Sequence, residues 1–435
     1  MEPKTMNRWL IIVGAIVVQL ALGAIYAWPA FTTVLQGTPS NPSQYSFTKT
    51  ETQAIFSAGL ATFAVFMILG GRLQQKIPPR TVALGGLLLG VGYILSGFVG
   101  ASFVGKLLTI GIVGGAGIGV AYGVPIAIGV KWFPDKKGLA SGLSVAGFGF
   151  GSLIWQMLAN PPAILGIRGL IQTEKNIFTV ANLDQVFMIY GVLFLILVAL
   201  GSLVMINPPQ GYKVPVPVSK TTQKSQAPET RDLASGQMLR TWQFYALWSM
   251  FVFGALAGLM VIGNVANFAR DPRYGFQGYG FTAIQAADFA VIGAAIFIPI
   301  LNGLGRITWG TVSDRIGGRK ALLIMFLLQA AVTLAFFFTT RSQFLFYPIA
   351  GLIAFNFGGT LSMLPKVTAD LFGSKNMGAN YGLMFTAYGV GGIAGPILAG
   401  MVQDYGLSFL YAFIPASILC LVAAVLAFVM KPPRT

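Results

Sequence analysis

The sequence predicts an all-α membrane protein whose twelve transmembrane helices form two pseudo-symmetric bundles of six. Of its 435 residues, 55% are hydrophobic and only 9% are charged, too few charges to solvate a globule of this size. Apolar runs of about 20 residues, the length that crosses a bilayer, recur along the whole chain. In addition, loops of the first half reappear in the second half at a fixed spacing.

Each predicted span is an apolar run between short polar segments. The twelve runs cover residues 9–35, 51–70, 81–103, 107–130, 138–160, 185–207, 242–268, 282–311, 321–340, 343–366, 380–402 and 407–430. The 55 glycines fit this class, because small residues allow membrane helices to approach closely. The first run is long enough to remain as a spanning helix, so we expect no cleaved signal sequence.

The segment between the sixth and seventh runs differs from both halves. It is rich in Pro, Lys, Ser, Thr and Gln, a composition that cannot bury an apolar core. We therefore expect an N-terminal six-helix bundle over 1–207, a cytoplasmic linker over 208–241 and a C-terminal six-helix bundle over 242–435.

The basic residues predict the orientation. With the N-terminus inside, twenty of the 28 lysines and arginines fall in inner segments and seven in outer ones. Both termini and the linker are expected to face the cytoplasm from the inner (plasma) membrane. In a soluble protein, a net charge of +16 would suggest binding of nucleic acid. In this chain, the basic residues set the topology and contact anionic lipid.

Two pairs of loops carry the internal repeat. Residues 71–80 follow the second span as residues 310–319 follow the eighth, at an offset of 239. The same offset pairs Phe133 with Phe372 in the loops after spans four and ten. One offset at two loops indicates a duplicated six-helix unit, and such parallel repeats place a substrate site near the midplane between the halves.

Several kinds of chemistry are excluded by composition. The chain has one cysteine, Cys420, and no histidine, which excludes an intramolecular disulfide, zinc sites and histidine acid–base catalysis. No phosphate-binding loop and no nucleophile–base pair is visible. We expect no enzyme activity, no cofactor and no metal. No Asp or Glu falls in mid-span, so a built-in proton relay is not visible either.

The main candidate for a binding residue is Arg306, inside the eighth run. An arginine near the middle of a membrane helix costs about 2.5–3.5 kcal/mol on insertion scales and usually has a function. Its planar guanidinium can bind a carboxylate through two parallel hydrogen bonds, which a desolvated cavity strengthens. The alternative is a structural arginine that pairs with a neighbouring helix or reaches the surface. Asn302, one turn earlier, either orients the guanidinium, binds substrate or bonds a neighbouring helix.

Following Arg306, residues 310–320 read GxxxDRxGGRK, and this loop in a six-plus-six chain resembles the major facilitator superfamily of secondary transporters. Further segments are similar to the oxalate/formate antiporter family, which is related to the monocarboxylate transporters. They are GAGIGVAYG at 115–123, KWFPDKKGLASG at 131–142, GQMLRTWQF at 236–244, NGLGR at 302–306 and NYG at 380–382. The resemblance implies the major facilitator fold and exchange or symport of small carboxylate anions by alternating access, with Arg306 as counter-charge.

The resemblance also bears on which anion is carried. By alignment through residues 380–382, Tyr388 occupies the place where an oxalate carrier of this family has a second basic residue. One cation matches a monoanion, whereas a dianion in a low-dielectric cavity would need two. Formate, lactate or pyruvate is therefore favoured over oxalate. At Asn302 the monocarboxylate transporters often hold an aspartate thought to relay protons, which asparagine cannot do.

Aromatic residues of spans one, four, ten and eleven complete the candidate site, since they can wall a small cavity and offer hydroxyl donors. We favour a binding role for Tyr26 and Tyr122, and packing for Phe357 and Phe385. The full predicted substrate-binding set is Tyr26, Trp28, Tyr122, Asn302, Arg306, Phe357, Phe385 and Tyr388.

A conformational latch is predicted in the loop after the eighth span. Its residues are Gly310, Asp314, Arg315 and Arg319. We expect them both to join helices that separate during transport and to anchor the loop in the cytosol. In the first copy of the loop, Gln75 replaces the acid and Pro78 replaces a glycine, so a latch there is in doubt.

These features predict a monomeric secondary transporter of small monocarboxylates, acting as an antiporter or proton symporter, with oxalate a further possibility. Its expected partners are the carboxylate substrate and membrane lipid, not nucleic acid. Two alternatives stay open: a carrier of the same fold for an amino acid, sugar or drug, and a membrane sensor that moves no solute.

Overall fold

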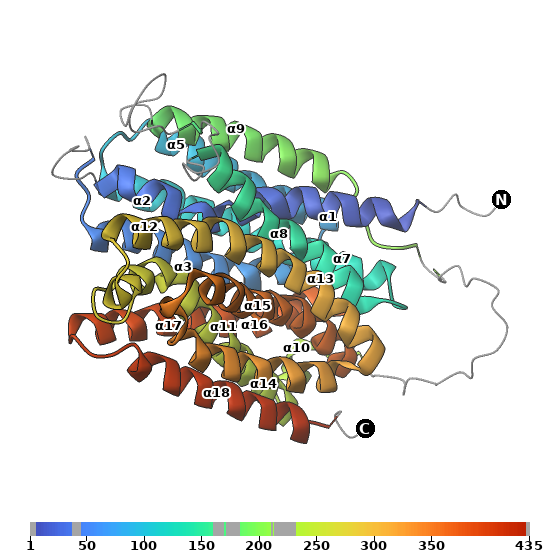
Figure 1. Cartoon of the computed structure of the whole chain (residues 1–435). Helices are drawn as coiled ribbons and strands as arrows, with labels where there is room; N and C mark the ends of the chain where they lie inside the picture. The colour runs from blue at the N-terminus through green and yellow to red at the C-terminus, as the bar shows by residue number, and fades with distance from the viewer. Residues whose placement is uncertain are drawn as a thin grey trace.

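Twelve long apolar helices lie side by side in the computed structural model (Figure 1). The structure describes residues 6–36, 45–159, 169–170, 183–209, 212 and 232–431. The twelve predicted spans are present in the predicted order, which confirms the fold class. Their ends differ from the predicted ones by a few residues. The tenth, for example, continues to Phe372, where Gly373 ends it with a φ of 85° that favours glycine.

The first six spans are built from nine α-helices and three short 3-10 or π segments. They are α1 (Arg8–Leu22), η1 (Gly23–Ala27) and α2 (Pro29–Gln36); α3 (Lys49–Leu73); α4 (Pro79–Ala83), η2 (Leu84–Gly86) and α5 (Leu87–Ser96); α6 (Phe103–Lys106), η3 (Leu107–Gly114) and α7 (Gly115–Trp132); α8 (Lys137–Ala159); and α9 (Leu183–Ser202).

The second six spans follow the short α10 (Ser235–Met238). They are α11 (Trp242–Arg270); α12 (Ala283–Ile292), η7 (Gly293–Phe297) and α13 (Ile298–Ile316); α14 (Gly318–Phe336); α15 (Gln343–Phe372); α16 (Met377–Met384) and α17 (Thr386–Asp404); and α18 (Leu410–Val429). Two 3-10 turns, η6 (Phe276–Tyr279) and η8 (Thr339–Arg341), lie in loops.

The first and last described residues of each half lie at the same end of the molecule, here called the linker end (Figure 1). Arg8 forms an ion pair of 2.7 Å with Asp135, and Gln243 donates to the carbonyl of Lys431 over 3.0 Å. Of the predicted linker, residues 210–211 and 213–231 lie outside the described residues. The amide of Leu233 donates to the carbonyl of Phe372 over 2.9 Å, which fixes α10 beside the end of α15.

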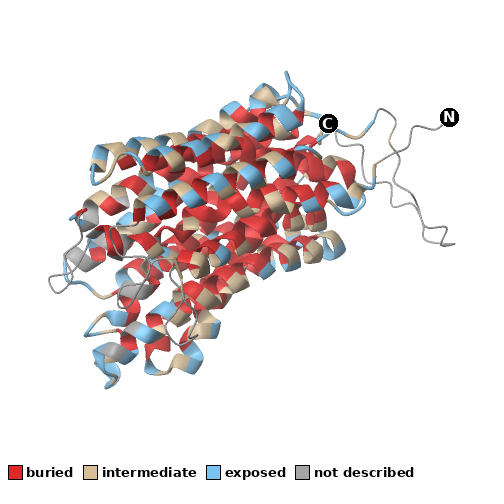
Figure 2. Ribbon diagram, turned by 90° about the horizontal axis from the view of Figure 1, so that it is seen from above, coloured by how far each residue is buried: buried red, intermediate tan, exposed pale blue. Residues whose placement is uncertain are grey.

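Burial follows the pattern of a protein surrounded by lipid. Buried residues fill the interior between the helices, and exposed residues line the outer faces (Figure 2). Many exposed side chains are large and apolar, such as Val65, Leu203 and Phe344, of which Phe344 is 78% exposed. A contiguous apolar perimeter of this size is favourable in a bilayer and not in water.

The two bundles touch at the linker end through glycines in corresponding segments of the two halves. Gly310 of α13 packs on the backbone of Gly138, and its repeat partner Gly71 packs on the backbone of Gly378. In the same way, Gly142 packs on Arg306, whereas Gly382 packs on Met67. The two interfaces are thus copies of each other. Arg306 and Met67 occupy equivalent places, so the duplication supplies only one cation.

The contact of Gly142 with α13 leads to a first prediction. A Cβ at this position would overlap the carbonyl oxygen of Arg306 and lie 3.0 Å from its carbonyl carbon. Overpacking costs about 1–3 kcal/mol, so Gly142→Val should shift the closed linker end toward opening by roughly 5- to 150-fold. A cysteine placed at the buried Ser362 should then react faster with a thiol reagent applied from that side. The control is Gly263→Val, because the nearest atom to its Cβ is 4.0 Å away. Equal reactivity in both variants would contradict the prediction.

Candidate functional site

Arg306 lies on α13 where this helix faces α8 of the other bundle, and it is 0% exposed. Its Nε donates to Oδ1 of Asn302 over 3.1 Å, and its Nη1 donates to the carbonyl of Val145 over 2.9 Å. The guanidinium carbon is 5.4 Å from the centre of the Phe148 ring. The side chain therefore points between the bundles and not toward lipid.

The second terminal nitrogen of Arg306, Nη2, is buried without a hydrogen-bond partner among the described residues. The five ion pairs of the described residues involve other cations. Lys106, which is also 0% exposed, is paired with Asp184 over 2.7 Å. A buried cation without its acid is unfavourable by several kcal/mol, so Arg306 is the group in this core that would gain most from an anion.

Asn302 uses its amide for two helix contacts. Its oxygen accepts from Arg306, and its Nδ2 donates to the carbonyl of Ala354 on α15 over 3.0 Å. Two of the roles predicted for Asn302, orienting the guanidinium and bonding a neighbouring helix, are thus combined in one side chain. Gly358 allows this geometry, because a Cβ there would overlap the carbonyl oxygen of Asn302.

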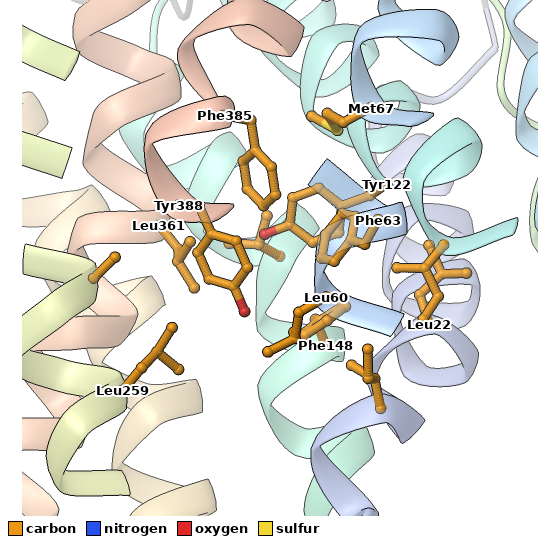
Figure 3. Close-up of a cluster of buried hydrophobic side chains, with 14 of the residues drawn as sticks. Leu22, Leu60, Phe63, Met67, Tyr122, Phe148, Leu259, Leu361, Phe385 and Tyr388 are labelled. Carbon is orange, nitrogen blue, oxygen red and sulfur yellow. The ribbon is translucent and has the colours of Figure 1, made fainter. Parts of the chain in front are cut away.

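Six aromatic side chains form a cluster that contacts Arg306 through Phe148. This aromatic cluster consists of Tyr26, Phe63, Tyr122, Phe148, Phe385 and Tyr388. Tyr122 of the first bundle lies 5.2 Å from Phe385 of the second, and Phe385 stacks on Tyr388 at 4.8 Å (Figure 3). The Tyr122 ring also meets that of Phe148 at 5.2 Å. Rings of both bundles therefore form one aromatic cluster, and Phe148 connects this cluster to the guanidinium.

Two of the three helices that carry tyrosines of this cluster are interrupted close to the tyrosine. Tyr26 lies in the 3-10 turn η1, and α16 ends at Met384 before α17 begins at Thr386. The hydroxyls of Tyr26 and Tyr388 form a hydrogen bond with each other, which joins the first bundle to the second. Tyr388, predicted to contact substrate, thus also bridges the two bundles.

Two members of the predicted set do not join the cluster. The indole of Trp28 donates to the carbonyl of Thr52 over 3.0 Å, and the residue lines a small apolar cavity within the first bundle. Phe357 packs its ring against Gly258 of α11. Phe385, for which packing was favoured, lies at the centre of the cluster. The binding role of all these residues stays a prediction.

The predicted latch joins the bundles at the linker end through Asp314. Its two carboxylate oxygens accept from the amides of Gly138 and Leu139, each over 2.8 Å, at the first turn of α8. The unpaired backbone amides and the dipole of a helix N-terminus stabilise a carboxylate placed there. Arg319 donates to the carbonyl of Phe428 over 2.7 Å within its own bundle, and Arg315 is exposed.

The first copy of the loop makes a weaker contact. Gln75, at the repeat position of Asp314, donates to the amide oxygen of Asn376 over 3.4 Å. Gly317 needs its φ of 87° at the end of α13, whereas Pro78 has a φ of −56° and begins a new helix. Of these two equivalent loop contacts, only the one at Asp314 therefore involves a charged side chain.

A second prediction concerns this asymmetry. Asp314→Asn removes the charge that accepts from two amides of the other bundle. Charge-assisted hydrogen bonds contribute about 1.5–3 kcal/mol, so the substitution should destabilise the closed linker end by a similar amount. Turnover in reconstituted vesicles should fall by about tenfold.

Asp271→Asn is the matched control for Asp314→Asn. Asp271 also accepts from two backbone amides, those of Arg273 and Tyr274, but all three residues belong to one loop of the second bundle. The control should lower the unfolding temperature with little change in turnover. If both variants slow turnover equally, the latch role of Asp314 is wrong.

Sequence reasoning missed several residues that the fold brings to Arg306. Phe63 and Phe148 are two of 34 phenylalanines, and nothing in their local sequence marks them. The carbonyl of Val145 has no sequence signal at all. Tyr381 belongs to a segment noted for the resemblance, but its buried hydroxyl becomes evident only in the structure.

The twelve helices in two matched bundles around a buried cation define a multi-pass membrane transporter. The chain belongs to the Major Facilitator Superfamily, whose family model matches residues 5–308 and 286–435. This membership confirms the resemblance noted in the sequence.

The relatives include carriers of carboxylates. The oxalate:formate antiporter of Oxalobacter formigenes is 28% identical over 434 residues, covering 98% of this chain and 92% of its own. Monocarboxylate transporter 1 of Mus musculus is 25% identical over 442 residues, covering 97% of this chain and 84% of its own. Among solved structures, the E. coli transporter FucP in the outward conformation matches with a TM-score of 0.63 at 15% identity, over 96% of this chain and 97% of that one. This last similarity concerns the fold alone.

Proposed function

We propose that the protein is a secondary active transporter of small monocarboxylates, such as formate, lactate or pyruvate, that works by alternating access. The observation that carries the proposal is Arg306, a fully buried guanidinium with a free Nη2 and no acid partner among the described residues. A substrate carboxylate would supply the missing charge and accept the unused hydrogen bond. The names of the two carboxylate-carrying relatives agree with this chemistry.

The charge of the site favours a monoanion. Arg306 is the cation beside the aromatic cluster, and Tyr388 bonds Tyr26 where a second basic residue would be needed for oxalate. Burying a second negative charge at such a low-dielectric site without a counter-charge costs several kcal/mol. Oxalate is accordingly the weaker candidate.

The contacts also support an orientation in the membrane and a conformational state. We infer that the linker end faces the cytoplasm, because the basic residues concentrate there. Gly138, Gly142, Asp314 and the pair Lys137–Asp370 join the bundles at this end, so the site is closed toward the cytoplasm. The Tyr26–Tyr388 bond also joins the two bundles, and we infer that it closes the site toward the outside. A monomer in the inner membrane, with bundles 1–207 and 242–435, completes the proposal.

The coupling mode follows from which groups surround Arg306. Around it lie the Asn302 amide, the Val145 carbonyl, the Phe148 ring and tyrosines, and within the described ranges no Asp or Glu pairs with it. Exchange of one carboxylate for another, or a proton moving with the substrate, is therefore favoured over a relay through a protein acid.

The test is counterflow in vesicles reconstituted with the purified protein. Vesicles loaded with unlabelled formate, lactate, pyruvate or oxalate are diluted into the same labelled compound. We expect transient accumulation of at least one monocarboxylate, stronger than that of oxalate. Accumulation of neutral sugars or amino acids in place of carboxylates would overturn the proposal, and ligand-induced stabilisation without any counterflow would indicate a sensor.

A further inference from the structure

Tyr381 is a buried tyrosine on α16, four residues before the break at Phe385. It is 1% exposed, and its ring lies 5.8 Å from that of Phe385 in the aromatic cluster. Its hydroxyl is buried without a hydrogen-bond partner among the described residues, as is Nη2 of Arg306. Two donors without acceptors thus lie in the same part of the interface between the bundles.

The Tyr381 ring contacts Phe385, whose ring lies 5.2 Å from that of Tyr122. Tyr122 in turn contacts Phe148, the ring beside the Arg306 guanidinium. Three other buried tyrosines have hydroxyls with protein partners: those of Tyr26 and Tyr388 bond each other, and that of Tyr190 donates to the carbonyl of Trp155 over 2.5 Å. Tyr381 differs from these three because its hydroxyl has no partner among the described residues, and its ring belongs to the cluster that includes the ring beside the buried cation.

The residues on either side of Tyr381 fix its orientation. The side chain of Asn380 donates to the carbonyl of Leu233 over 3.0 Å and accepts from Ser235 over 2.9 Å. Gly382 packs against α3, where a Cβ would lie 2.8 Å from the carbonyl oxygen of Met67. These contacts fix the rotation of α16 about its axis. The Tyr381 side chain therefore stays in the interior although its hydroxyl has no hydrogen-bond partner among the described residues.

A carboxylate resolves both unpaired donors at once. Its two oxygens offer about four acceptor positions, whereas a neutral apolar group offers none. We propose that Tyr381 is a specificity-determining residue whose hydroxyl donates to the substrate carboxylate beside Nη2 of Arg306. A site that holds unpaired buried donors discriminates strongly against ligands without the matching acceptor. This inference rests on the proposed transport of carboxylates and adds a donor from a different helix to it.

The test is Tyr381→Phe, which removes the hydroxyl and keeps the ring. Counterflow of the best monocarboxylate should show a KM raised at least about tenfold, since a hydrogen bond to a charged acceptor is lost, with a maximal rate near that of wild type. Tyr93→Phe is the control, because it removes a hydroxyl from a tyrosine that is 2% exposed within the first bundle. Its KM should stay within about twofold of wild type.

Stability measurements separate binding from a structural role. If the hydroxyl serves the substrate, the empty Tyr381→Phe protein should unfold at or above the wild-type temperature, while the stabilisation produced by added substrate shrinks. A lower unfolding temperature of the empty variant, or a KM equal to that of wild type, would overturn the inference although wild-type transport still supports the proposed function. If the wild type transports no carboxylate, the proposed function fails and this inference fails with it.

Discussion

Arg306→Ala is expected to abolish carboxylate transport. The substitution removes the cation of the site and leaves the substrate charge buried without a partner. Truncating one member of a buried hydrogen-bonded charge pair costs about 2–5 kcal/mol, so affinity should fall by at least about 30-fold. Labelled counterflow of the best monocarboxylate should drop to the level of empty vesicles. The account fails at this point if the variant transports at the wild-type rate.

Two further variants define what the guanidinium contributes. Arg306→Lys keeps the charge but loses the planar pair of donors, and its compact ammonium cannot reproduce the bonds to Asn302 and Val145. It should transport with much weakened affinity. Arg341→Ala removes an exposed arginine that stacks on Tyr279 in a loop, and it should behave like wild type. Affinity of Arg306→Lys equal to wild type would contradict recognition through two donors.

Tyr388→Lys is expected to shift the preference toward dianions. The substitution places a second cation beside the aromatic cluster and breaks the bond to Tyr26. Two opposite charges 4 Å apart attract by about 4 kcal/mol at an effective dielectric constant of 20, and part of this offsets the desolvation of the lysine. The ratio of oxalate to lactate affinity should therefore rise by at least about tenfold.

Competition of unlabelled oxalate and lactate against one labelled substrate gives this ratio directly. Tyr388→Phe also loses the bond to Tyr26 but adds no charge, so it should leave the ratio unchanged. Tyr405→Lys adds the same charge at an exposed loop position, 74% exposed, and should have no effect either. An unchanged ratio in Tyr388→Lys would show that the number of cations does not set the choice of anion.

The fold could be predicted because each element has a local cause. Apolar runs predict the spans. Gly317 and Gly373 directly follow two helices and have a positive φ, which glycine adopts without strain. The repeat offset of 239 predicted a duplicated six-helix unit, and the pairs Gly71–Gly378 and Gly138–Gly310 make equivalent contacts between the halves. Arg306 was evident for the same reason, since a charge in an apolar run stands out.

The surroundings of Arg306 could not be predicted, because they depend on contacts between distant segments. The carbonyl of Val145 and the ring of Phe148 reach it only when α8 packs on α13. The same holds for the bond between Tyr26 and Tyr388, 362 residues apart. Trp28 lies close to Tyr26 in sequence, yet the break at η1 turns it toward Thr52. Local patterns identify such residues as candidates but do not assign their partners.

The central claim is that Arg306 docks the negative charge of the substrate. The most direct measurement is a thermodynamic cycle of binding, with the best monocarboxylate and its uncharged amide measured against wild type and Arg306→Ala. We expect wild type to prefer the carboxylate, and this preference should shrink by more than about tenfold in the variant. Equal preference in the two proteins would contradict it, because the charge would then be recognised elsewhere.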